Sequence, residues 1–204
     1  QLIRLGYDFR FQNNANGRIS YNNRYTLLLE DFDPTRTPEE NNPILLPSGS
    51  EYRYQSYWMR FETDPRRLLS IEMQHSGGEY FNGTRYELRP SITYRFQPFG
   101  SFTLDYSYNR IRLPLPYPSR NIHLIGPRLD LTLSKKIFLT NFMQFNTQNQ
   151  NVNINARFQW RFKPASDIFL VYTDNYFFSF ENPNSNWMPR TRALVFKMTY
   201  WLNL

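Results

Sequence analysis

Residues 151–162 of this chain are NVNINARFQWRF, and from Val152 onward apolar and polar side chains alternate without interruption. The apolar positions are Val152, Ile154, Ala156, Phe158, Trp160 and Phe162, and the polar ones are Asn153, Asn155, Arg157, Gln159 and Arg161. A period of two places the two sets on opposite faces of a β-strand. The run is longer than the usual strand of about 5–6 residues. At about 3.3 Å per residue and a tilt of about 45°, it spans the apolar band of an outer membrane, which is about 25 Å tall.

The same alternation recurs along most of the chain. It is clear at 2–12, 84–97, 101–109 and 194–204, and less regular at 18–31, 51–64, 67–77, 122–134, 136–148 and 167–175. Together with the first segment these make eleven predicted strands, joined in sequence as an antiparallel meander. In 51–64 the apolar phase changes between Tyr54 and Tyr57, which predicts a β-bulge.

The predicted connections differ in length. Turn-forming residues predict tight turns at 13–17, 64–67, 97–100, 134–136 and 163–166, and longer connections at 32–50, 78–83, 112–121 and 176–189, whereas 149–151 is short. Short and long connections therefore alternate for most of the chain. In an up-and-down barrel this places tight turns at one end and long loops at the other, as in outer-membrane barrels.

Composition narrows the fold class. The 204 residues include 18% aromatics, carry a net charge of +7, contain no cysteine and have a mean hydropathy of -0.65. No apolar run reaches the roughly 18 residues of a membrane helix. One face of each predicted strand is too aromatic for water, and the other is too charged for the dry interior of a soluble barrel. The sequence therefore predicts an all-β, transmembrane, antiparallel up-and-down β-barrel with about 11 strands in 1–204, aromatic outside and wet inside.

The strand phases predict two sets of site residues. The charged residues predicted to face the lumen are Arg85, Glu87, Arg89, Arg95, Asp105, Arg128, Asp130, Arg157 and Arg161. The aromatic residues predicted to face lipid are Tyr94, Phe96, Tyr106, Tyr108, Phe158, Trp160, Phe162 and Tyr200. The charged set has two interpretations, which are a ladder of structural ion pairs and a field that selects anionic solutes in a pore.

Other chemistry finds little support in the sequence. The two histidines, His75 and His123, and the lack of cysteine leave no multi-histidine or thiolate metal site. His75 and Ser76 are neighbours in a predicted strand, so their side chains point to opposite faces and cannot form a nucleophile–base pair. The arginines are scattered rather than clustered, which disfavours nucleic acid as a partner. We predict no catalytic residue, no cofactor and no metal site.

The end of the chain predicts a location and an orientation. The last segment, MTYWLNL, ends in a hydrophobic residue and resembles an assembly signal of bacterial outer-membrane barrels. With the C-terminus in the periplasm, the tight turns are periplasmic and the long loops extracellular. Counting back eleven strands starts the chain on the extracellular side, whereas such barrels have even strand numbers. We therefore expect 1–204 to be the C-terminal portion of a larger barrel whose upstream strands are missing.

Three blocks resemble a known family: FNGTRYELRPSITYRF (81–96), YNRIRLP (108–114) and MQFNTQNQNVNINARFQWRFKPASDIFLVYTDNY (143–176). They are similar to the C-terminal region of a Bacteroidota outer-membrane family of unknown function that follows a carbohydrate-binding family 9-like module. The resemblance implies an upstream periplasmic or surface sugar-binding-like module, and through it contact with glycans. It brings no catalytic residues.

The sequence is compatible with three functions. The first is a membrane platform or component of a larger envelope assembly, linked to glycan handling, with outer-membrane lipid and other outer-membrane or surface proteins as partners. The second is a solute pore with an arginine-rich lumen. The third, an outer-membrane enzyme, is the remotest, because it would need a Ser–His pair on one face.

Overall fold

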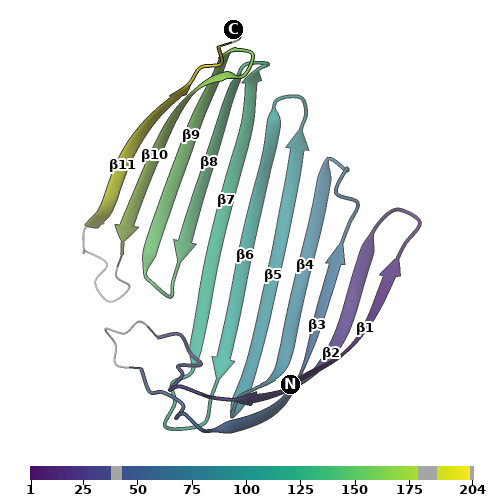
Figure 1. Cartoon of the computed structure of the whole chain (residues 1–204). Coiled ribbons are helices and arrows are strands. Elements are labelled where there is room, and N and C mark those ends of the chain that lie inside the picture. The colour runs from purple at the N-terminus through teal and green to yellow at the C-terminus, as the bar shows by residue number, and fades with distance from the viewer. Residues whose placement is uncertain (38–42, 179–187, 203–204) are drawn as a thin grey trace. The chain divides into compact units, whose positions relative to one another are not determined.

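The computed structural model describes residues 1–37, 43–178 and 188–202, and these form eleven β-strands (Figure 1). The strands are β1 (Leu2–Arg10), β2 (Asn16–Leu27), β3 (Glu51–Glu62), β4 (Leu69–Tyr80), β5 (Gly83–Phe96), β6 (Gly100–Arg112), β7 (Arg120–Ser134), β8 (Ile137–Asn146), β9 (Asn151–Lys163), β10 (Ser166–Phe177) and β11 (Met188–Thr199). They follow one another in a single antiparallel sheet in chain order. The predicted all-β, up-and-down arrangement of eleven strands is confirmed.

The chain divides into two compact units. Unit 1 comprises 1–91 and 106–123, and unit 2 comprises 92–105 and 124–204. Unit 1 therefore contains β1 to β4 with the adjoining parts of β5, β6 and β7, whereas unit 2 contains the remaining parts of those three strands and β8 to β11.

Helices do not contribute to the described structure. None of the described residues belongs to a helix with the length and apolar character that crossing a bilayer requires.

Three details of the sequence-based strand assignment are wrong. The β4–β5 connection is only Phe81 and Asn82, because the predicted loop at 78–83 is mostly strand. The pairing of β2 with β3 runs from 16↔62 to 27↔51 without a shift, so 51–64 contains no bulge. The last strand begins at Met188 and ends at Thr199; Tyr200 follows it, and 203–204 lie outside the described residues.

The loop prediction at 78–83 failed because Gly78 and the preceding Gly77 serve the sheet rather than a turn. A Cβ on Gly77 would lie 2.7 Å from the hydroxyl of Tyr57, so only glycine lets that ring lie across β4. Gly78 has a φ of +137°, and a Cβ there would lie 2.5 Å from the carbonyl oxygen of Gln55. Both glycines thus permit close approach between β3 and β4.

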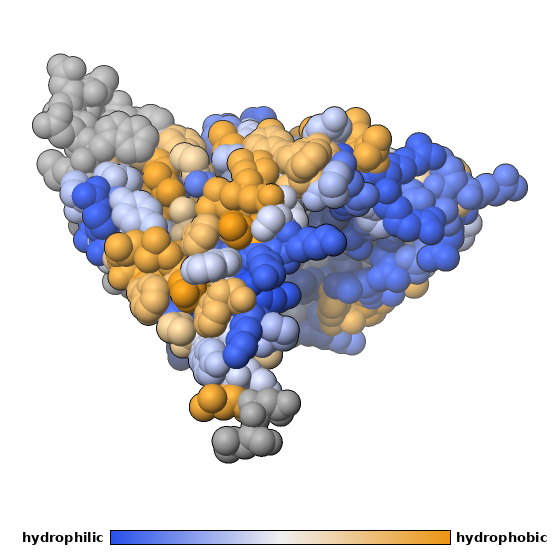
Figure 2. All heavy atoms as spheres, turned by 90° about the horizontal axis from the view of Figure 1, so that it is seen from above, coloured by the Kyte–Doolittle hydropathy of each residue, from blue (hydrophilic) through white to orange (hydrophobic). Residues whose placement is uncertain are grey.

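The two faces of the sheet differ sharply in polarity. Large apolar side chains are solvent-exposed along one face in both units, as with Leu5 (66% exposed) in unit 1 and Phe196 (64%) in unit 2. The buried hydrophobic side chains among the described residues are few, namely Ala15, Leu28, Leu46, Tyr54, Ile111, Leu113 and Val152. Figure 2 shows hydrophobic and hydrophilic residues gathered in separate areas of the surface. The described residues thus put no second layer over the apolar face.

The β3–β4 turn is held by an aspartate. Asp64 accepts hydrogen bonds from the backbone N–H of Arg66 (3.0 Å) and from its guanidinium (3.1 and 3.0 Å). The side-chain amide of Asn14, in the β1–β2 turn, donates to the same carboxylate at 3.2 Å. The Arg66 side chain, followed by its backbone N–H, holds the pKa of Asp64 well below its usual range. The carboxylate therefore links two neighbouring turns.

This geometry predicts that Asp64→Asn destabilises the protein at neutral pH and not in acid. Because the folded pKa lies below the unfolded one, the stabilisation is complete above the unfolded value, near 3.9, and is lost as the pH falls toward the folded value. We expect the urea midpoint of the variant to lie below that of the wild type at pH 7 and to approach it below pH 4. Equal differences at both pH values would contradict the assignment.

Candidate functional site: the polar face

The polar face of unit 1 is built from rows of side chains that the strand register aligns. Gly6 lies opposite Ser20, Ser20 opposite Trp58, and Trp58 opposite Ser76. The neighbouring row, farther from the tight turns, contains Arg4, Asn22, Ser56 and Gly78. Trp58 is the only bulky side chain in its row, so the ring has room beside it.

A depression of about 550 Å³ lies over these rows, and we call it the Trp58 pocket. The charged and aromatic residues of its lining are Arg4, Asp8, Arg18, Arg24, Tyr54, Tyr57, Trp58, Glu79, Tyr80 and Arg85. Four arginines against two carboxylates give the lining a net charge of +2. Small and polar residues from β1 to β4 form the rest, so the pocket combines positive charge, hydroxyl and amide groups and aromatic rings.

The arginines of the Trp58 pocket are of two kinds. Arg18 forms a bidentate ion pair with Asp8, with nitrogen–oxygen distances of 2.5 and 2.8 Å. Arg4 instead donates from Nε to the amide oxygen of Asn22 at 2.8 Å, and the guanidinium of Arg24 lies 6.0 Å from the ring centre of Tyr54. Within the described part of the chain, neither Arg4 nor Arg24 pairs with a carboxylate. These two guanidinium groups therefore carry positive charge that no ion pair neutralises.

Charged residues predicted to face the lumen come together on β5 in unit 1. Arg85 and Arg89 both form ion pairs with Glu87, and the Arg85 pair measures 3.4 Å. Arg85 also donates to the amide oxygen of Asn109 at 3.1 Å, and Ser76 donates to Glu87 at 3.3 Å. The three predicted residues therefore form one network, on the face that also carries Ser76 and Trp58.

In unit 2 the predicted charged residues form smaller groups. Arg128 pairs with Asp130 at 2.8 Å, and Thr140 on β8 donates to the same carboxylate at 2.9 Å. Arg161 pairs with Asp167 at 3.3 Å.

The remaining three predicted residues, also in unit 2, are Arg95, Asp105 and Arg157. Asp105 lies beside Gly126, and Arg157 lies opposite Thr140 and Val171. Arg157 forms no ion pair with any described residue. Register places Arg157, Arg161 and Asp130 on one face; that this face lines a lumen stays a prediction.

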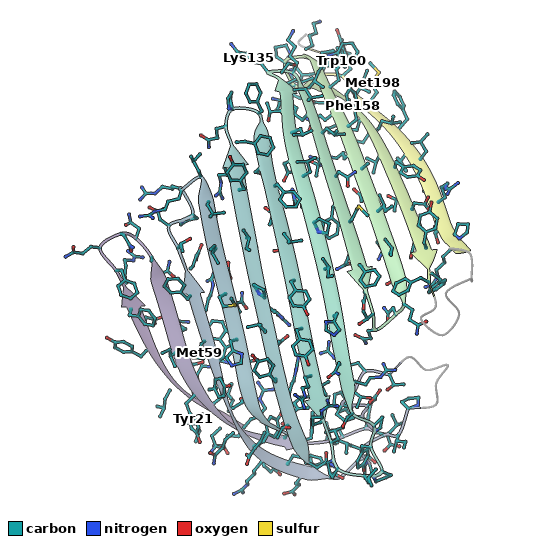
Figure 3. All side chains as sticks on the ribbon, turned by 180° about the vertical axis from the view of Figure 1, so that it is seen from behind. Tyr21, Met59, Lys135, Phe158, Trp160 and Met198 are labelled. Atoms are coloured by element: carbon teal, nitrogen blue, oxygen red, sulfur yellow. The ribbon has the colours of Figure 1, made fainter. Side chains whose placement is uncertain are left out.

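The predicted lipid-facing aromatics of β9 lie on the opposite face. Phe158 lies opposite Leu139 and Leu170, and Trp160 opposite Ile137 and Ile168. Figure 3 labels Phe158 and Trp160 on β9, Met198 on β11 and Lys135 in the β7–β8 turn. The β9 face is thus apolar across three strands.

Aromatic contacts link the end of this face to the tight turns. The Trp160 and Phe162 rings are 5.9 Å apart, and Phe162 stacks at 6.3 Å on Tyr200, whose hydroxyl accepts from Lys163 at 2.9 Å. Farther back along the chain, the rings of Tyr94 and Phe96 are 6.2 Å apart. Rings at the edge of an apolar face beside a lysine are typical of a membrane–water interface. Contact with lipid remains a prediction for all of these residues.

The histidine–serine pair is separated as expected. His75 Nε2 lies 2.8 Å from the hydroxyl of Tyr57 on the apolar face, whereas Ser76 donates to Glu87 on the polar face. Register agrees, because His75 lies opposite Met59 and Ser76 opposite Trp58. The two side chains cannot act together.

Sequence reasoning missed the residues that make the Trp58 pocket. Tyr54 and Trp58 were hidden by the supposed bulge in 51–64, because a phase change there assigns Trp58 no consistent face. An alternation that continues unchanged from Tyr52 to Trp58 places Tyr54 and Trp58 together on the polar face. That unbroken alternation is the signal that could have found both residues.

Comparison with solved structures finds similarity to the KdgM porin and to the KdgM porin in complex with disordered oligogalacturonate. Each is 11% identical to this chain, with 85% of this chain and 84% of that chain covered and a TM-score of 0.37. The likeness is distant and concerns the antiparallel, up-and-down arrangement of strands. No family model and no curated protein matches the chain, which is therefore not assigned to a family.

Proposed function

We propose that this chain is part of a bacterial outer-membrane β-barrel whose polar face lines a water-filled passage that favours anionic solutes. The observation that carries the proposal is the contrast between an exposed apolar face and a polar face that carries arginines on β1, β2, β5 and β9. A soluble sheet protein covers its apolar face with a second layer. Here that face is bare among the described residues, and lipid is the solvent that suits it.

The proposed orientation follows from the turns. The two-residue connections Lys135-Lys136 and Pro164-Ala165 follow the odd-numbered strands β7 and β9. The long connection 28–50 follows the even-numbered β2, although the even-numbered β4 is followed by only Phe81 and Asn82. Tight turns on the periplasmic side and longer loops outside are the usual arrangement in outer-membrane barrels. In this proposal Trp160, Phe162 and Tyr200 belong to the periplasmic aromatic belt.

Preference for anions rests on arginines that form no ion pair with a carboxylate of the described residues. On the polar face of unit 1, Arg4 and Arg24 lie over the Trp58 pocket, and Arg157 is likewise unpaired on the polar face of unit 2. Rings of arginine or lysine select anions in pores. The paired arginines contribute less to the field, because Asp8, Glu87, Asp130 and Asp167 neutralise them.

The test is the conductance of the full-length protein in planar bilayers under a salt gradient. We expect open channels with a reversal potential that indicates anion preference, and loss of that preference in Arg4→Gln/Arg24→Gln. The matched control is Lys135→Gln/Lys136→Gln, which removes the same charge from a tight turn and should conduct like the wild type. Silent insertion, or selectivity that the pocket variant leaves unchanged, would contradict the proposal.

The ion pairs of the polar face favour a second candidate, a membrane platform in a larger envelope assembly. Pairs such as Arg60–Glu72 at 2.9 Å and Arg128–Asp130 at 2.8 Å link or brace strands, as a structural ladder would. The family resemblance of 81–96 and 143–176, with its link to a sugar-binding-like module, points the same way. A barrel that inserts, stays silent and co-purifies with surface proteins or glycans would favour the platform.

A further inference from the structure

A track of rings crosses the apolar face of unit 1 from β3 to β7. The hydroxyl of Tyr57 meets His75 at 2.8 Å, and the rings of His75 and Tyr86 are 4.7 Å apart. Tyr86 lies 6.2 Å from Tyr108, and Tyr108 lies 5.0 Å from His123. Each strand from β3 to β7 contributes one member, so the track runs across the strands rather than along them. We call it the ring track.

The ring track has the chemistry of a membrane–water boundary. Tyrosine and histidine have an apolar body and a polar tip, and such side chains gather where apolar chains meet headgroups. Toward the tight turns, the same face of β3 continues with Met59 and Phe61, which are purely apolar. Toward the opposite end it carries Gln55 and Arg53. The side chains on this face of β3 therefore change from apolar to polar at the ring track.

Two arginines lie just beyond the ring track on β6. Arg110 and Arg112 follow Tyr108 by two and four residues, so they share its face and lie about 7 and 13 Å farther along the strand. Both are solvent-exposed, and neither forms an ion pair or a side-chain hydrogen bond with any residue in the described ranges. Two exposed guanidinium groups without an ion pair, just beyond the edge of an apolar band, are placed to bind an anionic headgroup.

A pocket of about 530 Å³ joins the rings to the arginines. Its lining is Tyr57, Gly77, Gly78, Glu79, Thr84, Arg85, Tyr86, Tyr108, Arg110 and Arg112. Gly77 has no side chain, so the Tyr57 ring lies directly over the backbone of β4 at the edge of the pocket. The carboxylate of Glu79 accepts from the backbone N–H of Gln55 at 2.9 Å and pairs with neither arginine. Arg85 belongs to the polar face and pairs with Glu87, so Arg110 and Arg112 against Glu79 leave the pocket with a net charge of +1.

We propose that this pocket binds a phosphate group of an outer-leaflet glycolipid of the lipid A type, with Arg110 and Arg112 as the phosphate ligands. The inference rests on the proposed outer-membrane location. Guanidinium groups bind phosphate oxygens in bidentate pairs, and basic residues just outside an apolar band are placed to meet lipid headgroups. Tyr86 and Tyr108 pack against the sugar and the first methylenes of the acyl chains, and Thr84 offers a further hydroxyl.

The test is lipid retention by the full-length protein in detergent micelles, measured by native mass spectrometry. The probes are bis-phosphorylated lipid A and the same lipid with both phosphates removed. We expect the wild type to prefer the phosphorylated form, and Arg110→Gln/Arg112→Gln to retain it about tenfold less, since charge-assisted hydrogen bonds are lost. Lys135→Gln/Lys136→Gln is the matched control, with the same charge change at the opposite end of the strands, and should bind like the wild type.

Each other outcome overturns the inference. Equal retention of both lipids would mean that phosphate is not recognised, and unchanged retention by the double variant would remove Arg110 and Arg112 as its ligands. Inorganic phosphate that displaces lipid A at equal concentration would identify a free-anion site instead. Insertion into lipid vesicles, measured in parallel, separates this inference from the proposed function. A wild type that fails to insert overturns both, whereas normal insertion with unchanged lipid retention overturns this inference alone.

Discussion

Phe158→Arg is expected to remove most of the folded, membrane-inserted protein. Phe158 lies on the apolar face of β9 between Leu139 and Leu170, with no acidic residue opposite it in either register. An arginine near the middle of the lipid-facing side of a barrel costs about 2–4 kcal/mol. The measurement is the folded fraction of the full-length protein in lipid vesicles across a urea series.

The matched control for this prediction is the next residue in the chain. Arg157 points to the polar face, opposite Thr140 and Val171, and forms no ion pair with a described residue. Arg157→Ala should therefore shift the unfolding midpoint by no more than about 0.5 kcal/mol. Comparable losses in the two variants would show that the two faces do not differ in solvent, and would remove the basis for placing this sheet in a bilayer.

The contrast between these neighbours explains why the fold could be predicted from the sequence. Period-two alternation is a local property, and a slip of one residue would exchange the whole apolar set with the polar set. The alternation around Phe158 and Arg157 therefore predicts on which face of the strand each side chain lies, without any knowledge of the partner strands. The same local signal predicted the number of strands, and turn-forming residues predicted the tight turn at 163–166, where only Pro164 and Ala165 lie between β9 and β10.

Register is the part that local alternation does not supply. The Trp58 pocket exists because Gly6, Ser20 and Ser76, from three other strands, fall in the row of Trp58. Nothing near Trp58 in the sequence indicates that its cross-strand neighbours are small. Alternation within a single strand also fails where both faces carry aromatic residues, as at Tyr54 and Tyr57. There it predicted a bulge that the pairing of β2 with β3 does not contain.

The ring track shows the same limit on the apolar face. Tyr106 and Tyr108 were predicted to face lipid, but their depth relative to Tyr57, His75 and Tyr86 follows only from contacts between strands. Without that depth, Arg110 is simply a charged residue near a strand end. The depth of the ring track shows that Arg110 lies just beyond the boundary between apolar and polar surface, where we propose that it binds an anionic headgroup.

Gly83→Ala is expected to destabilise the protein, although it adds only one methyl group. A Cβ at Gly83 would lie 2.1 Å from the backbone carbonyl oxygen of Arg112 and 2.9 Å from Cα of Leu113. Backbone atoms cannot rotate away as a side chain does, so β5 and β6 must separate at this point. Overpacking of this kind costs about 1–3 kcal/mol. The expected result is a lower urea midpoint of the full-length protein in vesicles.

Gly126→Ala is the control, because a Cβ there meets its nearest neighbour, a ring carbon of Phe142, at 3.6 Å, an ordinary contact. It should leave the midpoint within about 0.5 kcal/mol of the wild type. Separation at Gly83 would also displace Arg110 and Arg112 from Tyr86, so Gly83→Ala should retain less phosphorylated lipid than Gly126→Ala. A Gly83→Ala protein with wild-type stability would mean that β5 and β6 lie farther apart here than the 2.1 Å approach implies.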